Sequence, residues 1–497
     1  MAISTDERVG SSAREFLARS HGLFIDGNFV DPIQGETFET LDPATGEALA
    51  TIAHASAEDV DAAVKAARAA FEGPWADVLP ADRSRLLNRL ADLVEDAADE
   101  LAELESLDTG KPLTYARAVD LDLTLKHLRY YAGWPTKIVG DVVPVSVPDR
   151  LCYTLKEPVG VCGLIVPWNF PLLVAAWKLA PALAAGCTVV LKPAEETPLT
   201  ALRLAELVQE AGIPDGVVNV LTGDGSTGAA VVDHPGIDKV SFTGSTEVGR
   251  EIGSKAGRAL KRVTLELGGK SPNIILPDAD IDAAVAGSFL ALYFNTGQAC
   301  NAGSRLFVHS DQYDDVVSRL ADTARATVPS SGLEPETQLG PLVSARQKER
   351  VMGYIDKGVE EGAELVVGGH AMERDGYFVE PTLFTTDRDD LAITREEIFG
   401  PVLVALPYED IDEVARRAND TDYGLAAGVW TTNMSSAHRL ARRLKAGSIY
   451  INTWSPSDAA APFGGFKSSG IGREMGREGL DPYLEHKTVW VNVEESS

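Results

Sequence analysis

The feature that most constrains the fold is a regular alternation of short apolar runs and helical stretches between residues 160 and 267. Strand-like runs lie near 160–166, 187–191, 217–221, 239–243 and 262–267, and helical stretches lie near 172–185, 198–211, 225–233 and 246–257. Short strands joined by single helices predict a doubly wound parallel α/β sheet. Such sheets bind ligands beyond the carboxyl ends of their strands, so we expect a binding site there.

A second alternating α/β region is predicted from about residue 271 to residue 474. Its strand-like runs are 364–367, 402–406, 428–430 and 448–452, and its helices are predicted near 311–327, 344–361, 410–418 and 435–445. Ahead of the first sheet, helical periodicity predicts helices over 56–73, 81–107 and 115–133. The first 25 residues are polar, and we expect them to be frayed.

Two further segments are predicted to be extended. Residues 137–156 are rich in valine and interrupted by prolines, and the tail 487–493, KTVWVNV, is predicted to be a late strand. An exposed apolar edge strand promotes aggregation unless it is paired. We therefore expect these segments to form a small β element that joins subunits of a homo-oligomer.

The chain is acidic, with a formal net charge of −29 over 497 residues. This charge disfavours binding to nucleic acid or to an anionic membrane surface. Four cysteines are too few for a disulfide framework in a chain of this length, which favours a reducing compartment. The start lacks the parts of a signal peptide and no run is apolar enough to span a membrane, so we expect a cytoplasmic protein. We assign no metal ligands.

One of the cysteines, Cys300, has a setting that suits chemistry. It follows the apolar helical run 284–294 and lies in the segment FNTGQACNAGSR, residues 294–305. Glycines permit close approach of the backbone and amides donate hydrogen bonds. This setting favours a thiolate nucleophile, with an inert buried cysteine as the alternative.

Two glycine-containing loops are candidates for holding a dinucleotide. Residues 223–228 spell the fingerprint GDGSTG but follow the third strand of the predicted sheet, so a tight turn is the simpler interpretation. Residues 243–249 follow a strand and open a helix. There Ser245 can cap the helix and offer its hydroxyl to a pyrophosphate, with an ordinary N-cap as the alternative.

Lys192 and Glu195 follow the strand-like run 188–191. A carboxylate beyond a strand end can accept a hydrogen bond from the 2′-hydroxyl of an adenosine ribose, and it would repel a 2′-phosphate. This favours NAD over NADP. A solvated ion pair is the alternative.

Two further polar residues lie at predicted strand ends. Glu266 precedes a pair of glycines, where partial loss of solvent would raise its pKa toward that of a general base. Asn169 offers a side-chain amide to a developing oxyanion. The alternatives are an ion-paired glutamate and a turn asparagine.

Together these segments resemble the aldehyde dehydrogenase superfamily, in its hydrolytic NAD(P)-dependent branch. The resemblance spans about 23–493 and rests on PWNFP (167–171), KPAE (192–195), FTGSTEVG (242–249), LELGGK (265–270), the Cys300 segment, EEIFGP (396–401) and PFGGFKSSG (462–470).

The resemblance implies a role for each catalytic candidate. Cys300 would attack the aldehyde carbon, and the Asn169 amide and the Cys300 backbone N–H would hold the oxyanion. Glu266 would activate the water that hydrolyses the thioester. Because branches that transfer the acyl group to coenzyme A typically lack this glutamate, its presence argues for a free acid product. Lys178 and Glu474 match positions linked to a proton path from the base, with ion-paired charges as the alternative.

The resemblance also implies the cofactor contacts. Lys192 and Glu195 would contact the adenosine ribose, Trp168 and Ser245 the pyrophosphate, and Glu397 and Phe399 the nicotinamide ribose. The remaining positions assigned to the cofactor site are Val166, Gly225, Gly228, Phe242 and Leu267. Members of the family commonly have one more residue between the second and third glycines of the 223–228 loop, which bears on the assignment of Gly225 and Gly228.

The predicted substrate pocket is aromatic and lacks an arginine cluster. Its expected lining is Phe170, Val174, Trp177, Tyr293, Phe294, Asn301, Trp454 and Phe463. This favours an uncharged aliphatic or aromatic aldehyde. An amino- or betaine-aldehyde is the alternative, because aromatic walls can hold an ammonium group and Trp454 recurs in betaine-aldehyde-like members.

The implied architecture has three parts, and dimers or tetramers are usual in the family. Residues 1–136 and 157–267 would form the NAD-binding domain, 268–470 the catalytic domain, and 137–156 with 471–497 the oligomerisation element. Two other functions are weighed, a catalytically silent scaffold and a cofactor-independent ester hydrolase that uses Cys300 and Glu266.

Overall fold

The computed structural model describes residues 8–494. Its first sheet has eight strands in the order β19-β11-β10-β7-β8-β9-β1-β2. The five central strands are parallel and are β7 (Val161–Ile165), β8 (Thr188–Lys192), β9 (Val218–Val220), β10 (Lys239–Thr243) and β11 (Arg262–Glu266). Three short antiparallel strands flank them and are β1 (Leu23–Ile25), β2 (Asn28–Val30) and β19 (Gly470–Ile471). The predicted doubly wound parallel sheet is confirmed.

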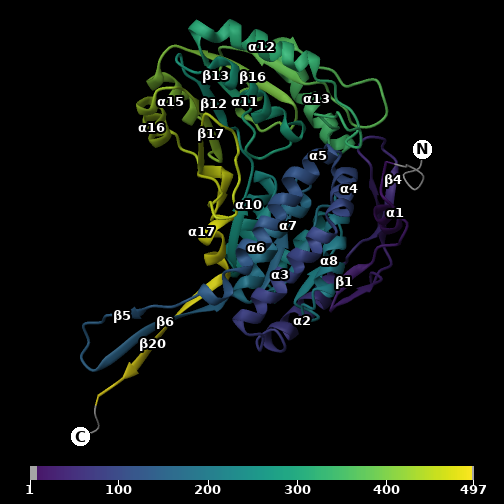
Figure 1. Ribbon diagram of the computed structural model, residues 1–497, viewed down its shortest axis with the longest axis vertical. Helices are drawn as coiled ribbons and strands as arrows, with labels where there is room; N and C mark the ends of the chain where they lie inside the picture. The colour runs from purple at the N-terminus through teal and green to yellow at the C-terminus, as the bar shows by residue number, and fades with distance from the viewer. Residues whose placement is uncertain (1–7, 495–497) are drawn as a thin grey trace.

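Helices cover both faces of this sheet, as the alternation predicts (Figure 1). One face packs against α3 (Pro80–Asp96), α4 (Ala98–Thr109), α6 (Asp122–Ala132), α7 (Pro171–Ala185) and α8 (Leu199–Glu210). The other packs against α2 (Ala57–Glu72), α9 (Gly225–Asp233) and α10 (Thr246–Ala259). A hairpin of β3 (Thr37–Leu41) and β4 (Ala48–Ala53) precedes α2.

Three N-terminal expectations need correction. The described part of the first 25 residues is not frayed, because α1 (Ser11–Leu17) buries Phe16 in the core. The predicted helix 81–107 is two helices, since Ala97 leaves the helical conformation between α3 and α4. The predicted helix 115–133 begins with the short turn α5 (Leu113–Tyr115) and a π-helical turn, Ala116–Leu121, before α6.

The second sheet has seven strands in the order β14-β15-β16-β13-β12-β17-β18. All its neighbours are parallel except β14 and β15. The strands are β12 (Pro272–Ile275), β13 (Arg305–His309), β14 (Glu364–Val367), β15 (Thr382–Thr385), β16 (Val402–Tyr408), β17 (Ala426–Trp430) and β18 (Ser448–Ile451). The helices are α11 (Ile281–Tyr293), α12 (Tyr313–Ala326), α13 (Ala345–Glu360), α14 (Ala392–Arg395), α15 (Ile411–Asn419) and α16 (Met434–Arg443), and the short α17 (Gly476–Leu480) follows.

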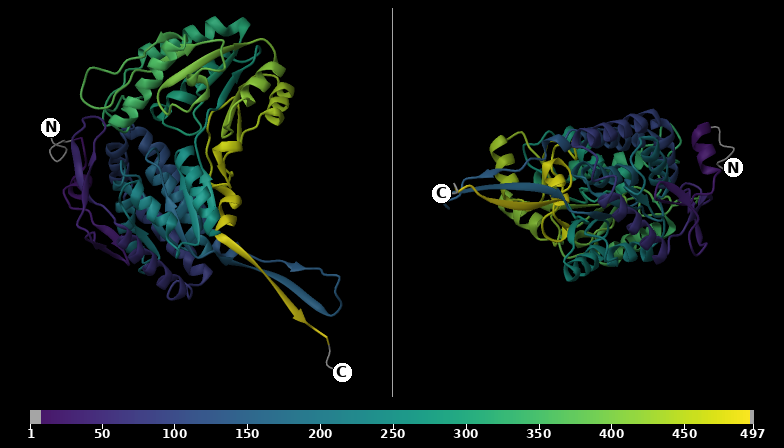
Figure 2. Two further views of the ribbon diagram at one scale, coloured as in Figure 1. Left: turned by 180° about the vertical axis from the view of Figure 1, so that it is seen from behind. Right: turned by 90° about the horizontal axis from the view of Figure 1, so that it is seen from below.

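The two segments predicted to be extended form one sheet that projects from the body of the molecule (Figures 1 and 2). β20 (Leu484–Asn492) pairs antiparallel with β6 (Arg150–Pro158), which pairs with β5 (Val142–Val143). Large apolar side chains are exposed on this arm at Val139, Val142, Val147, Leu151, Leu155, Trp490, Val491 and Val493. The arm therefore carries apolar surface and two strand edges that the chain itself leaves uncovered.

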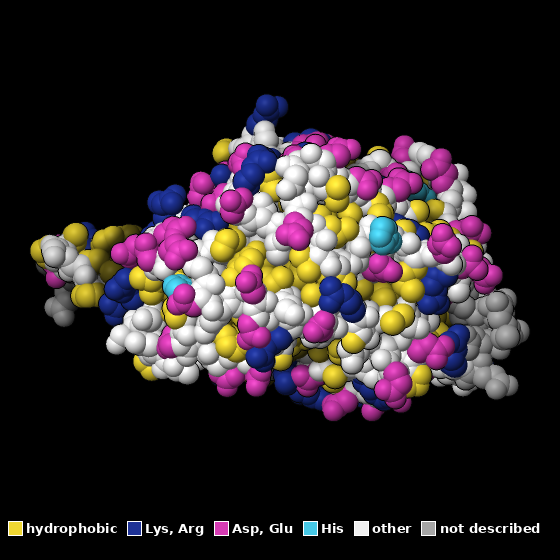
Figure 3. All heavy atoms as spheres, turned by 90° about the horizontal axis from the view of Figure 1, so that it is seen from above, with side chains coloured by type: hydrophobic (Ala, Val, Ile, Leu, Met, Phe, Trp, Pro, Cys, Tyr) yellow, Lys and Arg dark blue, Asp and Glu magenta, His cyan; other side chains and the backbone are white. Residues whose placement is uncertain are grey.

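Acidic side chains are scattered over the face of the molecule drawn in Figure 3. Figure 3 shows acidic side chains spread across one face among basic and apolar ones, with no single acidic patch. Among the residues that the structure describes, no helix is long and apolar enough to cross a membrane.

Candidate active site

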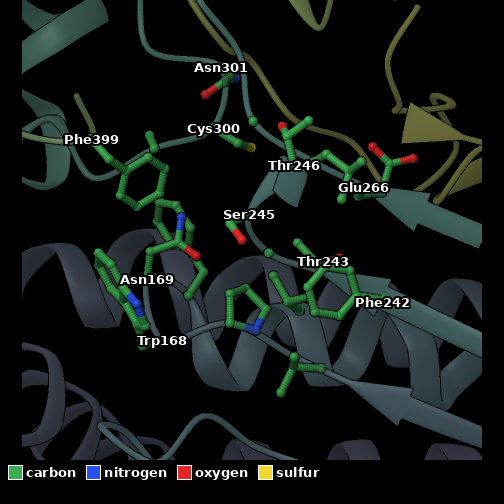
Figure 4. A pocket seen from close by; sticks show the side chains of 18 of the residues that line it. Trp168, Asn169, Phe242, Thr243, Ser245, Thr246, Glu266, Cys300, Asn301 and Phe399 are labelled. Carbon is green, nitrogen blue, oxygen red and sulfur yellow. The ribbon is translucent and has the colours of Figure 1, made fainter. Parts of the chain in front are cut away.

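A cavity of about 1550 Å³ lies at the carboxyl ends of the first sheet and is closed by loops of the second region. β7 leads into residues 166–169, β8 ends at Lys192, β10 leads into 243–245, and β11 ends at Glu266. The loop that carries Cys300 faces them (Figure 4). The cavity thus lies at the strand ends where the sequence predicts a ligand site.

Most of the predicted site residues line this cavity. They are Val166, Trp168, Asn169, Phe170, Val174, Trp177, Lys192, Glu195, Gly225, Gly228, Phe242, Ser245, Glu266, Leu267, Phe294, Cys300, Asn301, Glu397, Phe399, Trp454 and Phe463. Lys178, Glu474 and Tyr293 do not line it. Tyr293 points from α11 into the apolar core, where its hydroxyl donates to the Thr382 carbonyl at 2.8 Å, so its proposed place in the substrate pocket needs correction.

The Cys300 loop is held in an uncommon backbone conformation. Asn295 and Thr296 have positive φ angles of 51° and 57°. A Cβ on Gly269 would lie 2.4 Å from the Cys300 carbonyl oxygen, so only glycine lets the two loops approach. The Asn169 side-chain amide donates to the Gln298 carbonyl at 2.9 Å, which ties the loop after β7 to the Cys300 loop.

The surroundings of the Cys300 thiol disfavour its ionised form. Burial raises the pKa of Cys300 to about 12, and the carboxylates of Glu397 and Glu266 act in the same direction. A thiolate nucleophile therefore stays a prediction, because burial and the nearby acidic side chains disfavour the charged form of this thiol.

Glu266 ends β11 with its carboxyl group buried and unpartnered. Neither carboxyl oxygen has a hydrogen-bond partner among the described residues. Burial raises its pKa well above the usual value, and the Glu474 carboxylate adds to the rise. A Cβ on Gly464 would lie 2.6 Å from one of these oxygens, so only glycine lets the backbone pack this closely against the carboxyl group. An ion-paired structural role does not describe this residue.

Lys178 and Glu474 form a buried ion pair behind the cavity. The Lys178 Nζ lies 2.7 Å from Glu474 Oε1 and 2.9 Å from Ser241 Oγ. Both charges act on the pKa of Glu266, Glu474 raising it and Lys178 lowering it. The pair is electrostatically coupled to Glu266, while a proton path remains a prediction.

The far end of the cavity is polar and more open. Lys192 Nζ lies 3.3 Å from a Glu195 carboxylate oxygen, and the Glu195 side chain is 36% exposed. The two predicted loops differ in how their helices are capped. Asp224 caps α9 with a carboxylate, whereas Ser245 caps α10 with a neutral hydroxyl that accepts from the Val248 N–H at 3.3 Å. An anion therefore meets a favourable helix end only at α10.

Between the two ends lie two aromatic rings and a buried acid. The rings of Trp168 and Phe399 pack edge-on, with their centroids 5.2 Å apart. Glu397 accepts from the Gly269 N–H at 3.0 Å, and burial raises its pKa to about 7. Figure 4 shows Trp168 and Phe399 on one side of the cavity and Glu266 on the other, with Cys300 between them.

Aromatic rings form the pocket beside Cys300. Phe170 stacks on Phe294 with ring centroids 6.1 Å apart, and Trp177 contacts Phe463 at 5.6 Å. Further lining residues were not predicted from the sequence, and they include Tyr115, Val119, Leu123, Arg346, Gln347 and Asp458. Helical periodicity in 115–133 gives the face of that helix but not what lies opposite it, and the others follow no motif.

Comparison with known proteins agrees with this geometry. The model of the aldehyde dehydrogenase family matches residues 29–489. The mitochondrial aldehyde dehydrogenase of Homo sapiens is 51% identical over 475 residues, covering 95% of this chain and 92% of that protein. The NAD+ complex of an aldehyde dehydrogenase from Bacillus cereus superposes with a TM-score of 0.97 at 53% identity, covering 98% of this chain and 99% of that one.

A third similar structure is the betaine aldehyde dehydrogenase of Staphylococcus aureus in complex with NAD+. It has a TM-score of 0.95 and 40% identity, covering 98% of each chain. The match extends over nearly the whole length in every case. The chain therefore belongs to the aldehyde dehydrogenase family.

Proposed function

We propose that the protein oxidises an aldehyde to the carboxylic acid with NAD, through a covalent intermediate on Cys300. The observation that carries this proposal is the convergence of a thiol, a side-chain amide and an unpartnered carboxyl group on one cavity. Cys300, Asn169 and Glu266 all line it, although they lie far apart in the sequence. The family match and the NAD+ complex of the Bacillus cereus relative support the same reaction.

The polar end of the cavity fits a dinucleotide. Ser245 and the N-terminal N–H groups of α10 suit a pyrophosphate, and Lys192 with Glu195 suits an adenosine ribose. The negative charge of Glu195 disfavours a 2′-phosphate, so NAD is preferred over NADP. Trp168 is assigned with Ser245 to the pyrophosphate, and Glu397 and Phe399 are assigned to the nicotinamide ribose; all four line the cavity.

The first half of the reaction takes place on sulfur. The Cys300 thiolate attacks the carbonyl carbon, so a C–S bond forms while the C=O π electrons move onto oxygen. The Asn169 amide and the Cys300 N–H donate to that oxyanion, and one such donor contributes about 3 kcal/mol in other enzymes. NAD, when bound, supplies the hydride acceptor and a positive charge that favours the thiolate. The acyl group remains on Cys300 as a thioester.

The second half is hydrolysis. Glu266 takes a proton from a water molecule, which attacks the thioester carbon, and the C–S bond breaks to release the acid and the Cys300 thiolate. Glu266 lines the cavity and its carboxyl oxygens have no hydrogen-bond partner among the described residues, so the cavity can supply that water. The Lys178–Glu474 pair adjusts the charge state of Glu266 from behind and is proposed to receive its proton.

The decisive experiment mixes the purified protein with NAD and hexanal and measures both products. We expect NADH and hexanoate in equal amounts. Folded protein that forms no NADH with a broad aldehyde panel would favour a silent scaffold. Ester cleavage by a protein that does not bind NAD would favour the cofactor-independent hydrolase.

The substrate is proposed to be an uncharged aliphatic or aromatic aldehyde. The pocket beside Cys300 is walled by Phe170, Trp177, Phe294 and Phe463, with Val119 and Leu123 adding apolar surface. Such a wall stabilises a chain or ring by burial of apolar area. A kcat/KM panel should rank hexanal and phenylacetaldehyde above trimethylammonio- and amino-aldehydes.

An amino- or betaine-aldehyde is the second candidate, and one observation favours it. Trp454 and the exposed carboxylate of Asp458 both line the same cavity, and an aromatic ring beside a carboxylate attracts an ammonium group. The relative from Staphylococcus aureus is a betaine aldehyde dehydrogenase. The reverse ranking in the panel would select this candidate.

The remaining proposals concern assembly and location. We propose that the arm of β5, β6 and β20 joins copies into a homodimer or homotetramer, supported by its exposed apolar side chains. The division into 1–136 with 157–267, 268–470, and 137–156 with 471–497 belongs to the same proposal. A monomeric mass by light scattering would contradict the assembly. A cytoplasmic location remains a prediction from the sequence.

A further inference from the structure

A buried lysine outside the motifs contacts the backbone of Asn169. The Lys111 side chain is 1% exposed, and its Nζ lies 3.0 Å from the Asn169 carbonyl oxygen. The same ammonium lies 3.3 Å from Glu105 Oε1 and 2.5 Å from Asp120 Oδ1. It also lies 4.5 Å from the centre of the Phe170 ring. Lys111 therefore contacts both the residue proposed to hold the oxyanion and the next residue of the pocket wall.

Lys111 and its two carboxylate partners connect three separate elements to the loop after β7. Glu105 lies on α4, and its second carboxylate oxygen accepts from the Leu172 N–H at the start of α7, at 3.4 Å. Asp120 lies on the π-helical turn Ala116–Leu121. Such turns are rare and are frequently found beside functional sites. The ion cluster thus ties α4, the π-helical turn and the start of α7 to one point beside the cavity.

The backbone of Lys111 is itself fixed. Gly110 ends α4 with a left-handed φ of 79°, and a Cβ there would lie 2.6 Å from Pro341. The Ser106 hydroxyl donates to the Lys111 carbonyl at 2.7 Å. The lysine is therefore presented in one orientation, with little conformational freedom to lose.

The Asn169 carbonyl is held from two sides and its amide from a third. Lys111 Nζ and Asn295 Nδ2 both donate to the carbonyl, and the Asn169 amide donates one N–H to Gln298. One N–H of the amide is then left for an oxyanion. We infer that Lys111 is a positioning residue that fixes the Asn169 amide for oxyanion binding, an inference that rests on the proposed function of Asn169.

A purely structural role is the competing explanation. Burying an ion cluster is costly, and a well-packed apolar replacement is often as stable, so stability alone gives weak reason for a buried lysine here. A misplacement of about 1 Å in a reacting group can cost on the order of 100-fold in rate. Positioning of Asn169 is therefore a stronger reason for a buried lysine here than stability is. The two explanations differ in whether the effect of Lys111 depends on the Asn169 side chain.

A double-mutant cycle tests that dependence. We expect Lys111→Met to lower dehydrogenase kcat/KM by about 10- to 100-fold, and to lower NAD-independent cleavage of 4-nitrophenyl acetate similarly. In an Asn169→Ala background the same change should cost less than about threefold, because the amide it positions is already gone. Asn169→Ala leaves the backbone carbonyl, and with it the contact to Lys111, in place.

The matched control is Arg203→Met. Arg203 lies on α8, and its Nε donates a hydrogen bond at 3.1 Å to Glu100, which lies on α4 as Glu105 does. Its loss should reduce thermal stability while leaving both activities within about twofold. If Lys111→Met does not fold, Lys111→Arg and Asp120→Asn are put through the same cycle.

Each outcome decides. The inference is overturned if Lys111→Met lowers kcat/KM by the same factor in the Asn169→Ala background as in the wild-type background. It is also overturned if Arg203→Met lowers both activities as much as Lys111→Met does. An Asn169→Ala variant with wild-type kcat/KM contradicts the proposed function instead, and the inference falls with it. The positioning role is supported if Lys111→Met lowers kcat/KM only when the Asn169 side chain is present.

Discussion

The two ends of the cavity differ in how they treat charge. At the Cys300 end, burial raises the pKa of the thiol and that of the Glu266 carboxyl, whose oxygens have no hydrogen-bond partner among the described residues. At the other end, Lys192 and Glu195 form a partly exposed ion pair beside the neutral cap of α10. At the Cys300 end, the groups proposed to react need a bound positive charge to favour their ionised forms. The other end is prepared to hold a polar ligand.

The difference teaches that the cofactor site is complete before the catalytic site is. Anchoring groups that already pair with each other and are held in place need little reorganisation on binding. A nucleophile with a raised pKa needs a change of electrostatic environment before it reacts. Changes at the two ends should therefore affect different quantities, with chemistry at one end and cofactor choice at the other.

The largest expected effect is that of Cys300→Ala. Loss of the nucleophile should reduce kcat by about 10⁴-fold or more, as in other enzymes that use covalent catalysis. The NAD dissociation constant, measured by calorimetry, should stay within about threefold, because the anchoring groups lie at the other end. Cys152→Ala is the control, since Cys152 lies in β6 outside the cavity. Wild-type turnover without Cys300 would break the comparison.

The next largest effect is expected for Glu266→Gln. Hydrolysis of the thioester should slow by about 100- to 1000-fold while its formation continues, because only the second half needs this base. Rapid mixing should then reveal a burst of about one NADH per site followed by slow turnover. Steady NADH production at the wild-type rate would remove Glu266 from the role.

The raised pKa of Cys300 makes a pH prediction. Below a pKa of about 12, the thiolate fraction increases about tenfold for each pH unit. Alkylation of Cys300 by iodoacetamide in the cofactor-free protein should therefore keep rising from pH 7 to pH 9. Saturating NAD should move the profile to lower pH. A plateau below pH 8 without NAD would show that the sulfur is ionised by the protein alone.

The smallest of these effects is expected at the polar end. Glu195→Ser removes the charge that would repel a 2′-phosphate, so kcat/KM with NADP should rise by about tenfold. The kcat with saturating NAD should change by less than about twofold. An unchanged ratio of the two cofactors would place the selectivity elsewhere.

The first sheet could be predicted from the sequence because four of its five parallel strands are followed by a helix, with only β11 leading directly to another strand, β12. The second sheet was predicted less completely. β12, β13 and β15 are missing from the prediction, although β14, β17 and β18 are of similar length and were predicted. β12 and β13 directly follow the LELGGK motif and the Cys300 segment, so their few apolar residues have no periodicity separate from those motifs. The break at Ala97 has no glycine or proline to announce it.

The site shows the same limit. Cys300, Glu266 and Asn169 stand in motifs with distinctive residue types, so their convergence could be anticipated. Tyr293 was misplaced because helical spacing does not say which of two apolar environments a residue enters. Lys111 was missed as a site residue because its contact with Asn169 joins positions 58 apart in the chain.

The most direct test of the account is the intact mass of the Glu266→Gln variant after mixing with NAD and hexanal. We predict that the mass increases by one hexanoyl group, which peptide mapping locates on the peptide that contains Cys300. No such increase is expected when NAD is omitted. An unmodified mass during NADH formation, or a hexanoyl group on another residue, would contradict it.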